Sequence, residues 1–198
     1  RRDLRTHDHP ALVQAVAQGA GQPILPLFIV IPGPWQRLGG PARAYLTDSL
    51  SALREDLGGL HVRTGDPADV LRALAGEIGP LTVHVTAAHT PAGRERDARV
   101  AQALAGVGSQ LVATGSNYAV EPGTVLKGDG SPYRVFTPFH RAWLEAGWSA
   151  PSRRPQPFDL LDLPGDPLPE ESAPPGTVVP PAGEAAAQQR WAEFAQDH

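Results

Sequence analysis

Arginine is the side chain in this sequence whose type and placement best suit binding chemistry, and the clearest candidates are Arg2, Arg5 and Arg43. A guanidinium group carries a permanent charge and a planar set of donors, so two of them can clamp an anionic or polar aromatic ligand. Arg43 begins a predicted helix that follows a predicted strand, and the carboxyl edge of the strands is where open α/β sheets bind ligands. The alternative is that these arginines are surface residues that cap helix ends and pair with Asp3 or Asp48. The residues alone leave both interpretations open.

The common catalytic motifs are absent from the sequence. No Gly-rich phosphate-binding loop follows a strand, and there is no Gly-x-Ser-x-Gly turn for a serine nucleophile. The sequence has no cysteine, which excludes thiolate chemistry and disulfides. The run His7-Asp8-His9 is better explained as a helix entry, with Asp8 as the N-cap, than as part of a metal site. We therefore predict neither a catalytic residue nor a metal ligand in this chain.

The order of the apolar runs predicts an α/β fold with a Rossmann-like parallel sheet. Runs typical of buried strands cover residues 24–31, 60–64, 81–86 and 110–114. Helical patterns bounded by Gly or Pro alternate with them, at residues 10–19, 41–57, 67–76 and 91–105. Strands that alternate with helices through short connections form βαβ units, whose right-handed crossovers place helices on both faces of the sheet.

The alternation ends after Thr114. The run Lys127-Gly128-Asp129-Gly130 predicts a tight turn, and residues 136–145 predict a helix. Ten prolines between Pro151 and Pro181 exclude helix and central strand and predict an extended linker. Residues 185–196 then predict a final helix.

Composition narrows the classes of partner. No apolar run approaches the roughly 20 residues that a membrane-spanning helix needs. The net charge is −4, whereas a protein that grips DNA by its phosphates needs a basic face. We therefore do not expect this part of the protein to form a DNA-binding surface, and we expect no membrane partner.

Two long motifs resemble those of the DNA photolyase/cryptochrome family. The first is the opening run Arg-Arg-Asp-Leu-Arg with Asp-His-Pro-Ala-Leu, within residues 1–12. The second, at residues 130–143, is similar to the family's Gly-x-Pro-Tyr-x-Val-Phe-Thr-Pro-Phe-x-x-x-Trp segment. The motifs are correctly ordered and separated by a full α/β domain, and the resemblance extends more loosely to the final helix.

The resemblance implies a division of the chain into three parts. Residues 1–147 would be the family's α/β domain, residues 148–182 a Pro-rich inter-domain linker, and residues 183–198 the start of a helical FAD-binding domain. It also implies a further strand at the centre of the sheet, before Arg1. Loss of a central strand would leave buried backbone groups unpaired, so we expect the chain by itself to be marginally stable.

The resemblance further implies a site for a light-harvesting antenna chromophore. The segment Pro41–Leu46 resembles the Pro-Ala-Arg motif of deazaflavin-type members, whose arginine, here Arg43, contacts the antenna. Arg2 matches a second such arginine, and Phe28 falls where an aromatic ring packs on the chromophore. We therefore predict that Arg2, Phe28 and Arg43 form the antenna site.

The sequence departs from the family pattern after the third predicted strand. Acidic residues expected near Ala88 and Thr90 are absent, and the Asn-Glu pair of folate-type members is replaced by Ala92-Gly93. This pattern argues against folate and favours a deazaflavin or another flavin-like antenna, with an empty site as the alternative.

In function, the resemblance implies the N-terminal part of a blue-light-driven DNA repair enzyme. Members split cyclobutane pyrimidine dimers by electron transfer from reduced FAD, which would be bound by the C-terminal helical domain beyond His198. The implied partners are that helical domain and, through it, DNA that contains a pyrimidine dimer. We expect this chain alone to be inactive, and we expect a bacterial cytoplasmic location. A cryptochrome-type photoreceptor domain and an antenna-less scaffold domain remain alternatives.

Overall fold

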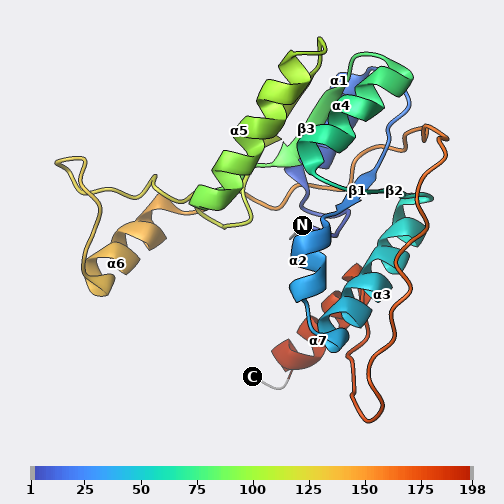
Figure 1. Cartoon of the computed structure of the whole chain (residues 1–198). Coiled ribbons are helices and arrows are strands. Elements are labelled where there is room, and N and C mark those ends of the chain that lie inside the picture. Colours follow the sequence, from blue (N-terminus) through green and yellow to red (C-terminus); the bar gives the residue numbers. More distant parts are fainter. Residues whose placement is uncertain (1–2, 197–198) are drawn as a thin grey trace.

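The structure is a computed structural model that describes residues 3–196. Its helices and strands follow the predicted alternation up to Thr114 (Figure 1). The helices are α1 (Pro10–Gly19), α2 (Pro32–Arg37), α3 (Gly40–Leu57), α4 (Pro67–Ile78), α5 (Pro91–Ala105), α6 (Phe136–Ala146) and α7 (Glu184–Gln196). The strands are β1 (Leu27–Val30), β2 (His61–Thr64), β3 (Thr82–Thr86) and β4 (Gln110–Thr114).

The four described strands form two parallel pairs rather than one continuous sheet. β1 pairs with β2 from Leu27↔His61 to Val30↔Thr64, and β3 pairs with β4 from Thr82↔Gln110 to Thr86↔Thr114. No ladder joins β1 to β3 among the described residues. The fold class is as predicted, a mixed α/β fold with short parallel strands. The further strand expected before Arg1 lies outside the described residues.

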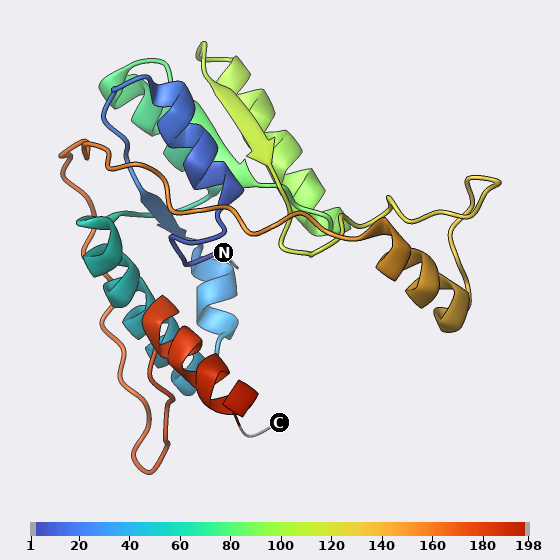
Figure 2. The ribbon, with the colours of Figure 1, turned by 180° about the vertical axis from the view of Figure 1, so that it is seen from behind.

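A shared apolar core holds the two strand pairs together on one face. Leu71 of α4 and Val100 and Leu104 of α5 are buried there, and Leu104 is fully enclosed. Side chains from both strand pairs pack against this α4/α5 core, namely Leu27, Ile29, Val83 and Leu111. On the other face, α1 contacts β3 and β4 (Figure 2). Helices therefore cover both faces, and apolar packing bridges the break in the hydrogen-bonded ladder.

Helix starts follow the proline positions, with one correction. Pro stands in the first turn of α1 to α5, where its missing N–H costs no hydrogen bond. The N-cap of α1 is His9, whose Nδ1 accepts from the Leu12 amide at 3.2 Å, and not Asp8. Asp8 has φ of +47°, and its carboxylate instead accepts from the amide of Ser152 at 3.0 Å. The predicted cap was wrong because Asp8 binds the linker.

Three element boundaries differ from the sequence prediction. β1 is shorter than predicted because Pro26 interrupts it, although Ile24 forms a parallel bridge with Leu160. The helix α2 was not predicted, since its six residues include two prolines and a glycine. α4 continues past Gly76 to Ile78 and ends at Gly79, because a single interior glycine costs only about 1 kcal/mol.

The Pro-rich linker is extended, as predicted, but it is fastened to the α/β body. The Ile24 amide donates to Asp159 O at 2.8 Å, and the Leu161 amide donates to Ile24 O at 2.9 Å. Further along, the amide of Asp166 donates to Val62 O at 2.8 Å. The linker therefore covers one end of the β1–β2 pair before it turns away.

The loop before α1 joins the linker and the last helix to the body. Glu184, the first residue of α7, accepts from the Thr6 amide at 2.8 Å, the Thr6 hydroxyl at 2.9 Å and the His7 amide at 3.1 Å. His7 Nδ1 lies 2.9 Å from the same carboxylate. We call these contacts the Glu184 latch. α7 runs beside α3 in both views, and a Cβ on Gly183 would lie 2.7 Å from that of Ala52 (Figures 1 and 2).

The helix α6 projects from the body and has no buried residue (Figure 1). Its aromatic residues were predicted to gather into one group, but they form separate pairs with neighbouring rings: Tyr133–Phe139, Phe136–His140 and Trp143–Trp148. Phe136 is 72% exposed. The turn predicted at residues 127–130 is present, with the Gly130 amide donating to Lys127 O at 2.8 Å.

Candidate functional site

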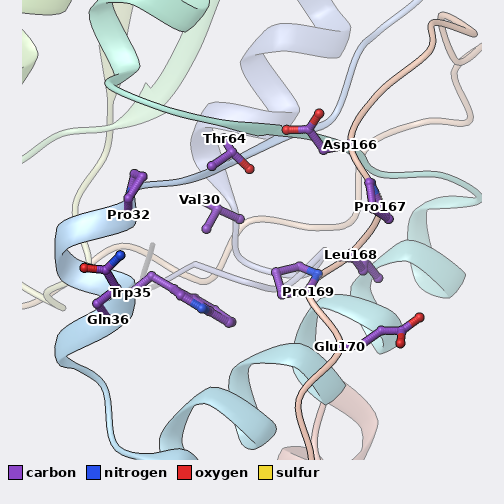
Figure 3. Close-up of a pocket in the computed structure, with 10 residues that line it drawn as sticks. All are labelled: Val30, Pro32, Trp35, Gln36, Thr64, Asp166, Pro167, Leu168, Pro169 and Glu170. Atoms are coloured by element: carbon purple, nitrogen blue, oxygen red, sulfur yellow. The ribbon is translucent and has the colours of Figure 1, made fainter.

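An open pocket of about 540 Å³ lies at the carboxyl ends of β1 and β2 (Figure 3). This is the edge at which open α/β sheets bind ligands. The lining residues come from three places: the strand ends (Val30 and Thr64), the helix α2 (Pro32, Trp35 and Gln36), and the linker (Asp166, Pro167, Leu168, Pro169 and Glu170).

The parallel register and the short helix α2 build two walls of the pocket. Val30 pairs with Thr64 as the last residues of their strands, so their side chains lie side by side at the sheet edge. The chain then enters α2 through Pro32, and the helix brings the half-buried Trp35 to the pocket. In Figure 3 the indole of Trp35 and the ring of Pro169 lie on either side of the space below Val30. The result is an apolar slot with a flat aromatic wall.

The third wall depends on His61. Arg63 Nε donates to His61 Nε2 at 3.0 Å, so the ring proton sits on Nδ1, which donates to Leu163 O at 3.1 Å. Arg63 is itself held by Glu77 at 2.7 Å. This chain of contacts fixes the linker just before it lines the pocket.

Gly165 lets the linker approach the sheet closely. A Cβ at this position would lie 2.7 Å from the ring of His61 and 3.0 Å from Val62 O, which is closer than real Cβ atoms come to a ring. The close approach allows the next amide, that of Asp166, to bond Val62 O. Glycine is therefore required here for space.

Arg43 stands in the first turn of α3 and is engaged by the linker. Its Nε lies 2.9 Å from Glu171 Oε1 as an ion pair, and its Nη1 donates to Leu38 O at 3.1 Å. Glu171 directly follows the last pocket-lining residue, so Arg43 is a near neighbour of the pocket without lining it. Of the two sequence interpretations for Arg43, pairing with a carboxylate describes its contact, although the partner is neither Asp3 nor Asp48.

The other two predicted site residues are not brought to the pocket lining. Phe28 lies in the middle of β1, half-buried and paired with Val62, two residues before Val30. Arg2 lies outside the described residues. The prediction of an antenna site formed by Arg2, Phe28 and Arg43 therefore stays a prediction, whereas the sheet edge that it named does carry a pocket.

Sequence reasoning missed the residues that line this pocket. Trp35 carried a signal, since an aromatic residue soon after a strand end is placed at the carboxyl edge of the sheet. Asp166 and Glu170 carried none, because only the folded linker brings them about 100 positions back to the strands.

A second space, of about 460 Å³, lies where the linker crosses the start of β2. Gly59 sits against Leu160 here, and a Cβ on Gly59 would lie 2.8 Å from that side chain. Arg54 and Asp162 stand at its border. Its walls are the same linker segment and the end of α3, so it is a packing seam of the linker.

A polar layer separates α1 from the carboxyl ends of β3 and β4. The Thr86 hydroxyl donates to Asp3 Oδ2 at 2.5 Å, and His9 Nε2 lies 3.7 Å from the same oxygen. Gln14 and Thr114 are hydrogen-bonded across the same interface. Burial lowers the pKa of His9 although Asp3 beside it acts to raise it, which keeps Nδ1 free to cap α1.

The region where acidic residues were expected has a structural role instead. The Thr90 hydroxyl caps α5 by accepting from the Gly93 amide at 3.2 Å. A Cβ on Gly93 would lie 2.8 Å from that of Ala88, so the loop and the helix start are tightly packed.

Metal-binding clusters and membrane-spanning helices are both absent from residues 3–196. This part of the chain contains no group of three or more His, Cys, Asp or Glu side chains placed to hold a metal ion. None of its helices combines the length and the apolar character that crossing a membrane requires.

Comparisons with known proteins agree on one family. Residues 1–158 match the DNA photolyase family model. The chain is 35% identical over 207 residues to the deoxyribodipyrimidine photo-lyase of Halobacterium salinarum, covering 95% of this chain and 43% of that protein. The chain thus spans less than half the length of this relative.

Solved structures show the same fold. A Synechocystis cryptochrome superposes with a TM-score of 0.82 at 21% identity, over 98% of this chain and 44% of that chain. An archaeal photolyase from Sulfolobus tokodaii, described with two FAD molecules and a novel light-harvesting cofactor, gives a TM-score of 0.69 at 23% identity, over 81% and 37%. Together with the family match over most of its length, these similarities show that this chain belongs to the DNA photolyase family.

Proposed function

We propose that this chain is the light-harvesting α/β part of an enzyme that uses blue light to split cyclobutane pyrimidine dimers in DNA. Support comes from the family match and from the curated relative, which is named for this activity and is 35% identical. The named activity of that relative favours repair over a signalling role. The division at residues 147/148 and 182/183, with reduced FAD and the DNA-binding surface in the part of the protein that follows, belongs to the same proposal.

The pocket at the carboxyl ends of β1 and β2 is the observation that carries the antenna proposal. Its volume of about 540 Å³ lies within the range of roughly 300–1,000 Å³ typical of small-molecule sites. Trp35 on one side and Pro169 on the other offer flat apolar surfaces to a planar ring (Figure 3). A deazaflavin or another flavin-like chromophore fits these walls.

The Sulfolobus photolyase supports a flavin-like antenna for this chain too, since its structure holds two FAD molecules and implies a novel light-harvesting cofactor in that relative. A bound antenna would supply absorbed light energy to the FAD of the following domain. The residues of this chain would bind and orient the ring, Trp35 and Pro169 through their faces and Thr64 and Gln36 through hydrogen bonds at its edge.

Arg43, Arg2 and Phe28 complete the proposed site. Arg43 reaches the pocket if Glu171 releases it, because the two residues are paired at the pocket border. A guanidinium there can donate to carbonyl oxygens of the ring.

The test uses the full-length protein, purified and reconstituted with a deazaflavin. We expect chromophore retention and dimer splitting driven by light that the deazaflavin absorbs. In Arg43→Ala, loss of one charge-assisted hydrogen bond of about 1.5–3 kcal/mol should weaken retention roughly ten- to hundredfold. Splitting driven by light that FAD absorbs directly should be unchanged.

Two matched variants separate the explanations. Arg72→Ala removes an exposed arginine on α4 and should leave retention unchanged. Glu171→Gln frees Arg43, so retention should hold or rise if Arg43 binds the ring, and should fall as in Arg43→Ala if the ion pair only fastens the linker. A full-length protein that splits no dimers under blue light would refute the proposed activity.

A further inference from the structure

We infer that the pocket selects a chromophore without phosphate groups, and that Asp166 and Glu170 of the linker make this selection. The inference rests on the proposed antenna function and names the class of ligand: riboflavin-like or deazariboflavin-like rings rather than FMN or FAD.

The first step is the charge of the pocket wall. Asp166 and Glu170 are the ionisable side chains among its described lining residues, and both are carboxylates. Both are exposed, and Glu170 points outward at the rim in Figure 3, so they face whatever leaves the pocket toward solvent. The remaining walls are apolar or neutral.

The second step is the position of the nearest cations. Arg43 is paired with Glu171, the residue directly after Glu170. Arg37, at the end of α2, folds back along its own helix, where a Cβ on Gly33 would lie 3.4 Å from its Nη1. Neither guanidinium lines the described wall, so no positive charge there offsets the two carboxylates.

The third step is the chemistry of the ligand. A flavin or deazaflavin ring is flat and uncharged, and its imide N–H can donate to a carboxylate such as that of Asp166. A ribityl chain ending in a hydroxyl is neutral, whereas the phosphate of FMN carries one to two negative charges at neutral pH. Placing that charge beside two carboxylates is unfavourable even in a solvated rim. The linker therefore admits the ring and disfavours a phosphorylated tail.

The experiment uses the full-length protein with its FAD in place and measures additional binding of riboflavin and of FMN by fluorescence quenching. We expect FMN to bind at least about fivefold more weakly than riboflavin at low salt. The ratio should shrink as salt is added, because exposed charges are screened. In the double variant Asp166→Asn/Glu170→Gln the ratio should approach one, mainly through tighter FMN binding.

A matched control is Glu95→Gln/Glu145→Gln, which removes the same charge from exposed positions on α5 and α6 and should keep the ratio of the unaltered protein. Equal binding of riboflavin and FMN by the unaltered protein would overturn the selection while the flavin site stands. A ratio that changes equally in both double variants would assign it to net charge and overturn the role of the linker. Binding of neither compound would refute the antenna proposal itself.

Discussion

The carboxylate of Glu184 concentrates several contacts in one side chain that is only 10% exposed. It accepts hydrogen bonds from Thr6 and His7 and so satisfies backbone amides of the loop before α1. A carboxylate in such a position is difficult to replace, because its removal leaves donors without partners.

Replacement of Glu184 by alanine should lower the free energy of unfolding by about 1–3 kcal/mol, the usual effect of leaving buried donors unsatisfied. Urea denaturation followed by circular dichroism measures this. Glu193→Ala is the control, since Glu193 is an exposed residue of the same helix whose carboxylate accepts from Gln189 one turn earlier. Equal effects of the two substitutions would show that the latch contributes nothing.

The same carboxylate predicts a dependence on pH. Burial acts to raise the pKa of Glu184, but the hydrogen bonds from Thr6 and His7 outweigh it and hold the pKa below the ordinary value of 4.5. A lowered pKa means that the stabilisation is fully present above about pH 4.5 and is lost as the pH falls through the lowered value. The difference in stability between the unaltered protein and Glu184→Gln should therefore be constant near pH 7 and decrease below pH 4.5. A difference that grows on acidification would contradict this assignment.

At the scale of elements, the linker behaves as part of the α/β body between residues 159 and 171. It bonds Ile24, Val62 and His61 and contributes one wall of the pocket. Its prolines suit this role, because an extended chain without helix can follow the sheet edge while few of its amides need partners.

Gly165→Ala should displace this wall. The added Cβ would meet the ring of His61 at 2.7 Å, so the linker must shift, at a cost of about 1–3 kcal/mol for overpacking. We expect lower stability, faster proteolytic cleavage of the linker and weaker riboflavin retention in the full-length protein. Gly128→Ala serves as the control, since nothing lies within 4 Å of a Cβ there and its φ is not in the left-handed region. Unchanged cleavage and retention in Gly165→Ala would show that the linker tolerates the shift.

The elements also show what sequence patterns predict and what they do not. α5 and β4 have the predicted bounds because local signals, Thr90-Pro91 at the helix start and a short apolar run, agree with the tertiary environment. The cap at His9, the pocket wall at Asp166 and the partner of Arg43 depend on contacts with distant parts of the chain. Such contacts leave no periodicity in the sequence, so the sheet edge could be predicted while its lining could not.

For the whole molecule, the break between the strand pairs matters most. The α4/α5 core joins the pairs through apolar contacts, but hydrogen bonds run only within each pair among the described strands. In parallel strands alternate amides point to opposite neighbours, so part of β1 and of β3 faces the break.

Hydrogen exchange of residues 1–198 should reveal this arrangement. Amides of β1 that bond β2 and amides of β3 that bond β4 should exchange much more slowly than their sequence neighbours, by roughly a hundredfold or more. The measurement is exchange followed by NMR at single-residue resolution. Uniform protection along both strands would mean that another segment fills the break.

The Glu184 latch also has a consequence for how the chain is made. Thr6 and Glu184 are 178 positions apart, so a ribosome that adds about 5–20 residues per second needs roughly 10–35 seconds between them. Throughout that interval the nascent loop at Thr6 and His7 has no carboxylate to receive its amides. The strand pairs and their helices must therefore assemble first, and α7 closes the structure only when it leaves the exit tunnel.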